Sequence, residues 1–336
     1  MSNKRYAKYS IFLPVRNGGT HLSLCVSSIL AQSYPGFELI ILENQSTDGT
    51  AEWLQALDKR EPRVSVIAAE SAMSMEENWQ RILKIEKNEY MTIIGHDDLY
   101  DENFLEEIDK TIQEQPGASL YLTHFRLVDN EGKFMRYCNP IPRQESVAEF
   151  LAARMTRIRD SFGTGYVMRS ALYEQVGGIP AYPNLLYADD TLWISLMRSA
   201  HTAVSPRSCF SYRYHSKSVS GNANQDALFA GLKKHLEFLR RLVDSDPDIA
   251  RVMDHYGRPY ISRACQNYYY FLIKSAPLGR PVDRRKLLEI NSMMSEFCDQ
   301  TIKDTRASKL QMVLWHWLVG MGRKFLPLIE SALNKK

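Results

Sequence analysis

The sequence has few cysteines, and their arrangement indicates neither a zinc site nor a disulfide framework. The five cysteines are odd in number, widely scattered and without a Cys-x-x-Cys pair. This pattern excludes a zinc-ribbon protein and a small disulfide-stabilised secreted domain, and it fits a reducing cytoplasm. No signal peptide is visible, so we expect a soluble cytoplasmic protein.

The sequence also lacks a strong charge excess and a dinucleotide-binding fingerprint. Its 42 lysines and arginines against 39 acidic residues leave a formal charge of +3, and no basic stripe with interleaved aromatics occurs, so we expect no nucleic-acid partner. The Gly163-x-Gly165 pair is not a fingerprint, because position 168 is Met. The composition, 44% hydrophobic and 24% charged, is that of a globular protein. A chain of 336 residues can form one large domain with a helical appendage.

Short apolar strands alternate with helices in the N-terminal third. Four segments are predicted as strands, each followed by a polar loop: 9–15, 38–43, 64–69 and 90–95. A helix is expected from Met75 to Lys87. This alternation predicts an α/β fold with a mostly parallel sheet, whose polar loops meet at one edge.

Two adjacent carboxylates, Asp97 and Asp98, directly follow the fourth predicted strand. The carboxyl ends of such strands form the ligand crevice of an open α/β sheet. Hard oxygen ligands there suit Mg²⁺ or Mn²⁺ held together with substrate phosphates. We expect Asp98 to be a surface carboxylate that adds little to packing. The same pair also suits a solvated turn and an N-cap for a helix starting near Glu102.

Four short motifs follow one another in a recognisable order. They are Leu13 to Asn17, Glu43 to Thr50, Asp97-Asp98, and Ala188 to Trp193. In this order they resemble the inverting family-two glycosyltransferases of the GT-A fold, over roughly residues 8–220. The resemblance implies a Rossmann-like, mostly parallel sheet flanked by helices. It also implies a catalytic domain at 1–222 and a mostly helical C-terminal region at 223–336 for acceptor or membrane contact.

The activity that the resemblance implies is metal-dependent sugar transfer with Mn²⁺ or Mg²⁺. The donor is a nucleotide sugar, with a UDP-sugar favoured, and the acceptor is a hydroxyl of a saccharide or lipid-linked saccharide. Assembly of bacterial cell-surface polysaccharide or lipopolysaccharide is the implied setting. The sequence leaves open whether the protein forms a homo-oligomer.

The family's donor site carries over to this chain position by position. The residues implied to contact the nucleotide sugar are Pro14, Val15, Arg16, Asn17, Glu43, Asn44, Asp48, Asn78, His96, Asp97, Gly163, Thr164, Gly165, Arg213 and His215. Glu43-Asn44-Gln45 stands where many members have Asp-Asp-Gly, so the base or ribose contact involves a longer carboxylate or the Asn44 amide. His96 takes the first place of the Asp-x-Asp metal motif. Asp98 is then the preferred metal ligand, and Asp97 turns toward the ribose or the donor sugar.

Two further segments match the family, and each has a plain alternative. Tyr212 to Ser220 resembles the segment that closes over the diphosphate, in which His215 can ligate metal and Arg213 and Lys217 add phosphate donors. An exposed strand and loop is the alternative. Gly163 to Gly165 resembles the small-residue stretch beside the donor sugar, where a simple turn is the alternative. Trp79, next to Asn78, is more often a core residue than a stacking platform.

Inverting transfer needs a third carboxylate, because a base must take the acceptor proton on the face opposite the leaving nucleotide. Asp189 and Asp190 are the candidates, at the start of an apolar helix. An ungapped match to the family's Ala-Asp-x-x-Leu-Trp pattern selects Asp189, which we favour slightly. Reading the pair as a variant of Glu-Asp selects Asp190. Either one can instead cap the helix.

The C-terminal third is predicted to be helical and to carry a basic, aromatic end. Helices are expected at 226–243, 259–274 and 284–297. From Arg306 onward, six basic residues stand against one acid, around an apolar run from Met312 to Met321. The run is too short to cross a membrane, which needs about 20 residues. It suits an interfacial helix on an anionic inner leaflet, and a helix packed on the catalytic domain is the alternative.

Two other functions remain as alternatives to sugar transfer. A sugar nucleotidyltransferase shares a related sheet, but it normally has a glycine-rich, basic phosphate loop after the first strand, and Arg16-Asn-Gly-Gly is a poor version. A catalytically inactive sugar- or partner-binding domain is the third possibility. Release of free nucleoside diphosphate separates all three.

Overall fold

Two compact units make up the chain in the computed structural model, residues 1–264 and 265–336. The structure describes residues 7–214, 224–275 and 283–298. By packing, the first unit extends beyond residue 222, because α8 (Gln225–Val243) contacts α7 (Ala188–Met197) and α9 (Pro247–Val252) contacts α5 (Val147–Met155). The functional division expected after residue 222 stays a prediction. None of the helices in the described residues has the length and apolar character that a membrane crossing needs.

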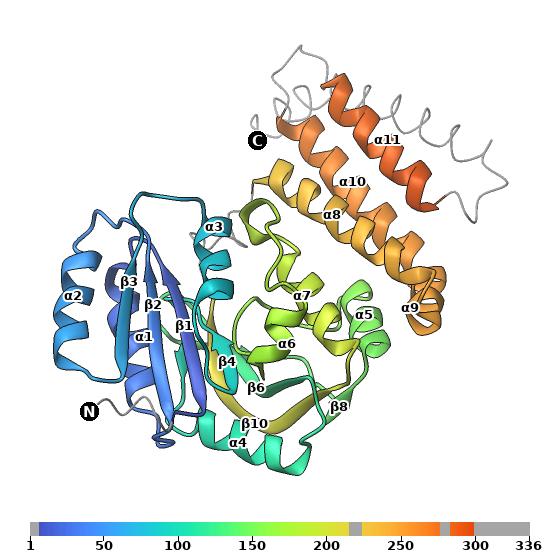
Figure 1. Cartoon of the computed structure of the whole chain (residues 1–336). Helices are drawn as coiled ribbons and strands as arrows, with labels where there is room; N and C mark the ends of the chain where they lie inside the picture. Colours follow the sequence, from blue (N-terminus) through green and yellow to red (C-terminus); the bar gives the residue numbers. More distant parts are fainter. Residues whose placement is uncertain (1–6, 215–223, 276–282, 299–336) are drawn as a thin grey trace, which may run out of the picture. The chain divides into compact units, whose positions relative to one another are not determined.

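One mixed sheet forms the centre of the first unit (Figure 1). Its main path runs β3 (Val64–Ala68), β2 (Phe37–Glu43), β1 (Tyr9–Val15), β4 (Tyr90–Ile93), β9 (Val167–Arg169), β6 (Leu120–Val128), β10 (Thr202–Arg213) and β5 (Leu99–Tyr100). β7 (Phe134–Tyr137) pairs with β6, and β8 (Gln144–Glu145) pairs with β10. The first four strands of the path are parallel, as the sequence predicts. β9 is antiparallel to both of its neighbours, so Met168 lies opposite Met91 on one side and Leu120 on the other.

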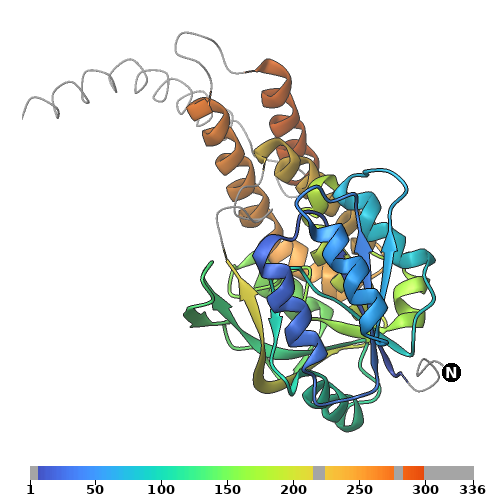
Figure 2. The same cartoon turned by 90° about the vertical axis from the view of Figure 1, so that its left-hand side faces the viewer.

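Helices cover both faces of the N-terminal strands. α1 (Gly19–Leu30) and α2 (Thr50–Arg60) lie side by side on one face (Figure 2), and α3 (Met75–Gln80) lies on the other. All seven residues of β1 are buried, because this strand has a neighbour on each side and helices above and below. The result is a closed hydrophobic layer from which the polar loops emerge at one edge.

The helices expected in the C-terminal third agree closely with the structure. α8, α10 (Arg258–Ser275) and α11 (Arg284–Cys298) begin and end within about two residues of their predicted bounds. α4 (Phe104–Glu114) follows the Asp97-Asp98 loop. The helix expected over 75–87 is shorter: α3 ends at Gln80 and a 3-10 turn, η2 (Arg81–Lys84), follows. The start of α3 is fixed by a capping box, in which the Ser74 side chain accepts from Glu77 N and the Glu77 side chain accepts from Ser74 N.

Candidate active site

A cavity of about 1070 Å³ opens where β1, β2 and β4 end and α7 begins. Most of the residues expected to bind donor, metal or acceptor line it: Pro14, Val15, Arg16, Asn17, Asn44, Asn78, His96, Asp97, Asp98, Gly163, Thr164, Asp189 and Asp190. Four do not line it: Glu43, Asp48, Gly165 and Arg213. His215 lies outside the described residues. The fold therefore gathers segments far apart in the sequence around one space.

Glu43, the last residue of β2, and Asn44, which follows it, support the turn after this strand. Glu43 is 3% exposed, and its carboxylate accepts from the backbone N–H groups of Gln45 and Ser46 at 3.1 and 2.6 Å. The Asn44 amide donates to Met73 O at 2.9 Å and accepts from Met73 N at 3.0 Å. These side chains hold the loop beside α3 in place.

The Ser-Thr-Asp-Gly-Thr motif ties the loop after β2 to the loop after β1. Asn17 N donates to the Ser46 hydroxyl at 2.9 Å, and Gly18 N donates to the Thr50 hydroxyl at 3.0 Å. The Asp48 carboxylate accepts from Gly19 N at 3.1 Å. Asp48 therefore links the two loops, and it does not line the cavity.

Asp98 corrects an expectation, because it is not a surface carboxylate. It is 1% exposed, and it accepts from the Thr164 hydroxyl at 2.7 Å and from Arg213 N at 3.0 Å. Burial, followed by the charge of Asp97, raises the pKa of Asp98 well above its ordinary value. Asp97 is half-buried and faces the cavity. Of the pair, Asp97 is the more open to a ligand.

Arg213 also departs from its expected role as a phosphate donor. Its side chain is buried, and its guanidinium donates to three backbone carbonyls: Asp97 O at 2.8 Å, Asp129 O at 3.1 Å and Asn130 O at 2.9 Å. Donors aimed at the backbone are not aimed at a diphosphate. Arg213 instead holds the Asp97-Asp98 loop against the β6–β7 turn.

The two carboxylates fit a divalent cation that takes its other ligands from a substrate. A Cβ atom on Gly95 would lie 2.8 Å from Asp97 Oδ1 and 3.1 Å from Asp98 Oδ2, so both oxygens converge over this glycine. Within the described ranges, no group of three or more His, Cys, Asp or Glu side chains surrounds a common metal position. One or two carboxylates completed by phosphate oxygens is the usual Mg²⁺ arrangement.

Asp189 and Asp190 lie in the first turn of α7 but in different surroundings. Asp190 is 3% exposed and forms a bidentate ion pair with Arg154, whose Nε lies 2.8 Å from Oδ1 and whose Nη2 lies 2.7 Å from Oδ2. Asp189 is half-buried at the cavity, where its Oδ1 accepts from Asp190 N at 2.9 Å. Burial, and then the charge of Asp190, raises the pKa of Asp189 to about 7.

Arg154 and Trp79 line the cavity, although no sequence motif selects either as a site residue. Arg154 lies on α5, and no motif marks an arginine on this helix. For Trp79 the sequence favours a core position over a stacking platform, yet it lines the cavity. A Cβ on Gly163 would lie 3.8 Å from both a Trp79 ring carbon and Asp189 Cβ, so this glycine keeps a slot open between indole and carboxylate.

Comparisons with known proteins give one family and a common fold. Residues 10–174 match the glycosyl transferase family 2 profile. The chain is 29% identical to the glycosyltransferase GlyG of Streptococcus pneumoniae serotype 4 over 38% of its own length, and this match spans only 42% of GlyG. It is 25% identical to TuaG of Bacillus subtilis strain 168, a glycosyltransferase whose name assigns it to teichuronic acid biosynthesis, over 63% of this chain and 81% of TuaG.

Two solved structures share the fold at low sequence identity. One is residues 1–349 of S. aureus TarS in complex with UDP-GlcNAc, with a TM-score of 0.67, 14% identity and coverage of 88% of this chain and 84% of that one. The other is the mannosyltransferase PcManGT of Pyrobaculum calidifontis in complex with GDP-Man and Mn²⁺, with a TM-score of 0.52, 13% identity and coverage of 91% and 90%. At this identity the likeness establishes the fold.

Proposed function

Since residues 10–174 form a glycosyl transferase family 2 domain on a GT-A fold, we propose that this protein is a metal-dependent inverting glycosyltransferase. It moves a sugar from a nucleotide sugar, with a UDP-sugar preferred, to an acceptor hydroxyl in the assembly of a cell-surface polysaccharide. One observation carries this proposal: a single cavity holds the carboxylate pair over Gly95 and, apart from it, the half-buried Asp189. Direct displacement at an anomeric carbon needs a cation at the leaving diphosphate and, on the opposite face, a base for the acceptor hydroxyl.

The donor half of the site is built by the loops after β1, β2 and β4. Arg16 and Asn17, after β1, line the cavity there, and so does Asn78 on α3, whose side-chain amide donates to Leu42 O and accepts from Arg81. Asp97, with Asp98 behind it, would hold Mn²⁺ or Mg²⁺. A cation bound there offsets the charge that develops on the leaving diphosphate. The convergence of two carboxylate oxygens over Gly95 supports this assignment.

The acceptor half of the site centres on Asp189. Its carboxylate takes the proton from the acceptor hydroxyl as the new bond to the anomeric carbon forms. A base works best when its pKa lies near the working pH, and burial raises the pKa of Asp189 to about 7. Asp190 does not suit this role, because its two oxygens are engaged by Arg154.

The geometry disfavours the nucleotidyltransferase alternative. A phosphate-binding loop after β1 needs backbone N–H groups that point at the ligand. Here the N–H groups of Asn17, Gly18 and Gly19 donate to side chains of the second loop. They are therefore committed to holding the two loops together.

A donor screen with the full chain and Mn²⁺ tests the proposal. We expect release of a nucleoside diphosphate from one or more nucleotide sugars, even with water as acceptor. Pyrophosphate release would indicate nucleotidyl transfer, and binding without any release would indicate an inactive domain. Asp189→Asn should lower kcat by about 10² or more while donor affinity, measured by calorimetry, stays near that of the parent. Full turnover in this variant would remove Asp189 as the base.

A further inference from the structure

The ion pair between Arg154 and Asp190 lies directly beside the proposed base. Arg154 comes from α5 and Asp190 from α7, 36 positions apart in sequence, and the pair is bidentate, with contacts of 2.7 to 3.0 Å. Arg154 lines the main cavity and also a second, small one, which Asp190, His235 and Tyr260 also line. A bidentate fork fixes the direction of both partners, which a lysine could not do.

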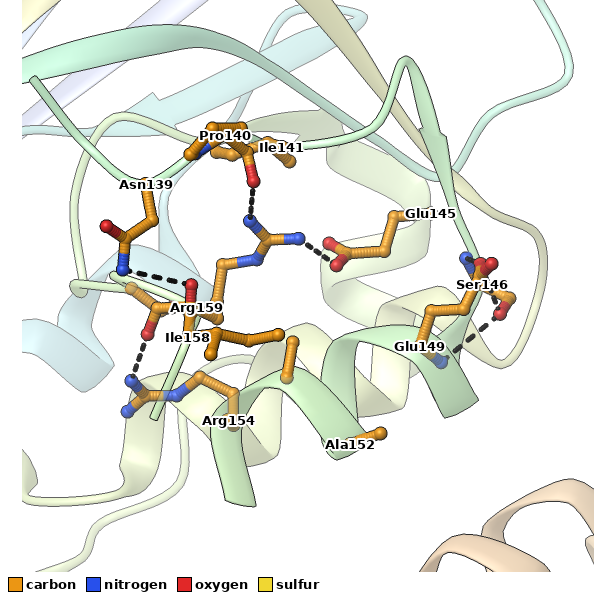
Figure 3. Close-up of polar contacts among 12 residues, drawn as sticks. Asn139, Pro140, Ile141, Glu145, Ser146, Glu149, Ala152, Arg154, Ile158 and Arg159 are labelled. Carbon is orange, nitrogen blue, oxygen red and sulfur yellow. Dashed lines mark hydrogen bonds and ion pairs between the residues drawn. The ribbon is translucent and has the colours of Figure 1, made fainter. Parts of the chain in front are cut away.

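Arg154 is also held from the side away from Asp190. Its Nη1 donates to the Arg159 carbonyl at 3.1 Å, and the Arg159 guanidinium pairs with Glu145 and donates to Pro140 O at 3.4 Å (Figure 3). The side chains of Arg159 and Glu145 are only 3% and 4% exposed. The buried Arg159–Glu145 pair therefore holds in place the backbone carbonyl that accepts from Arg154. The fork facing Asp190 is rigidly supported.

The backbone links this pair to the base. Asp190 N donates to Asp189 Oδ1 at 2.9 Å, so the residue held by Arg154 also orients the Asp189 carboxylate. One Asp189 oxygen, Oδ1, therefore already accepts a hydrogen bond from the backbone. The same contact brings the charges of Asp190 and Arg154 close to Asp189.

The other titratable groups around this pair are neutral near pH 7. Asp190 shares helix α7 with the base, and Tyr187 precedes that helix. His235 from α8 and Tyr260 from α10 face Asp190 from behind. Burial lowers the pKa of His235 to about 4 and raises the pKa values of Tyr187 and Tyr260 above their ordinary range. The charges that act on Asp189 from this side are therefore those of Arg154 and Asp190.

We propose that Arg154 and Asp190 are positioning residues that set both the direction and the ionisation of the base Asp189. The proposal rests on the function assigned to Asp189 above. Asp190 alone would repel a second negative charge on Asp189, and Arg154 alone would stabilise it. Paired, they largely cancel, so the pKa of Asp189 stays at about 7, where burial places it and where a general base is most effective. If the pair only joined α5 to α7, its loss would destabilise the protein without shifting the titration of Asp189.

The test is the titration of Asp189 in the full chain, followed by the carboxyl ¹³C signal of protein labelled at aspartate. The Asp189 signal is assigned by its loss in Asp189→Asn. We expect Arg154→Met to raise the pKa of Asp189 by about one unit or more, and Asp190→Asn to lower it by a similar amount. The double variant should return close to the parent. The acidic limb of the donor-hydrolysis profile, with UDP-GlcNAc and Mn²⁺, should move in the same opposite directions.

Controls separate this inference from the proposed function. Arg143→Met removes an arginine charge from an exposed pair with Glu114, outside the cavity, and should leave the Asp189 titration unchanged. Arg154→Lys keeps the charge, and Asp190→Asn is nearly isosteric, so each gives a result even if Arg154→Met does not fold. Unchanged titration in the Asp190→Asn variant, or shifts in the same direction for both single variants, would overturn the inference. Retained turnover in Asp189→Asn would instead overturn the assignment of Asp189 as the base.

Discussion

Asp97 and Asp98 are neighbours in sequence that meet different surroundings. Asp98 points into the protein, where a hydroxyl and a backbone N–H hold it, and Asp97 faces the cavity. The same division separates Asp190, which Arg154 holds, from Asp189. In both pairs one carboxylate is buried and held by protein donors, and the other is half-buried at the cavity. This division assigns structural and chemical roles that the motif alone leaves undecided.

We expect Asp98→Ala to destabilise the fold more than Asp97→Ala does. Removing the Asp98 carboxylate leaves the Thr164 hydroxyl and the Arg213 N–H buried without an acceptor, which costs about 1–3 kcal/mol. Urea denaturation measures both variants, and Asp98→Asn, which keeps the acceptor oxygen, is the matched control. In calorimetry, Asp97→Ala should lose the Mn²⁺-dependent part of UDP binding. A larger stability loss in Asp97→Ala would contradict the assignment.

Asp189→Asn should stabilise the protein at alkaline pH. The folded pKa of Asp189, about 7, lies above the ordinary value of 3.8, so the folded state binds the proton more tightly than the unfolded state. The stability from this group is fully present below pH 4 and is lost as pH rises through 7. Asparagine cannot ionise, so thermal unfolding at pH 8 should favour the variant by on the order of 2 kcal/mol. The two proteins should unfold alike near pH 4, and equal stability at pH 8 would rule out the raised pKa.

At the residue scale, the sequence could predict which motifs meet but not how each side chain is used. Strand ends must converge at one sheet edge, which places Asp97 at the cavity, and Asp189 reaches the same cavity from the first turn of α7. Which member of each acidic pair is buried and held in place depends on Arg154 and Arg213. These arginines come from other elements, and no local sequence pattern predicts which acidic residue each of them holds.

At the scale of elements, the segment before α7 is strained and tightly covered. Asn184, Leu185 and Tyr187 have φ angles of 53°, 55° and 65°, in the left-handed region that side chains rarely adopt. This segment lines the cavity and leads directly into Asp189. Helix α8 packs on it closely, because a Cβ on Gly231 would lie 2.4 Å from Leu186 O.

Gly231→Ala should therefore disturb the site from a distance. The new methyl group must displace the Leu186 backbone or α8, which costs about 1–3 kcal/mol and shifts the start of α7. We expect a lower melting temperature and a lower kcat, with donor affinity less affected. Gly257→Ala is the matched control, since its Cβ would meet only the flexible Met253 side chain, at 3.3 Å. Parent-like turnover in Gly231→Ala would show that the segment before α7 can shift without disturbing the base.

The elements that the sequence predicted best are those with a clear local pattern. The four N-terminal strands are short apolar runs followed by polar loops, α8, α10 and α11 are long helical segments, and the structure confirms them. The second half of the sheet was not predicted. β5 and β8 have two residues each and β9 has three, so they have little period to detect. Their places depend on long-range pairing, such as β9 between β4 and β6.

At the scale of the whole molecule, the catalytic motifs and the C-terminal basic segment are far apart in sequence. The four motifs lie before residue 220, and the apolar run with Trp315 and Trp317 lies after residue 306, outside the described residues. An enzyme that extends a lipid-linked saccharide needs its cavity near a membrane surface. Basic residues such as Arg323 and Lys324 flank the run. Each basic residue near an anionic leaflet contributes about 1 kcal/mol to the free energy of membrane binding. The interfacial helix stays a prediction.

Truncation after Ala307 should then separate membrane binding from catalysis. We expect the full chain to float with anionic liposomes at low salt, and to float less at high salt or with neutral lipid, because the attraction is screened over about a Debye length. The truncated chain should stay in the soluble fraction while it still releases nucleoside diphosphate from the donor, since its cavity residues all precede position 229. If the full chain does not float, the apolar run is instead a packed helix. In that case the truncation should lower the melting temperature or cause aggregation, because it would expose the surface that the tryptophans cover.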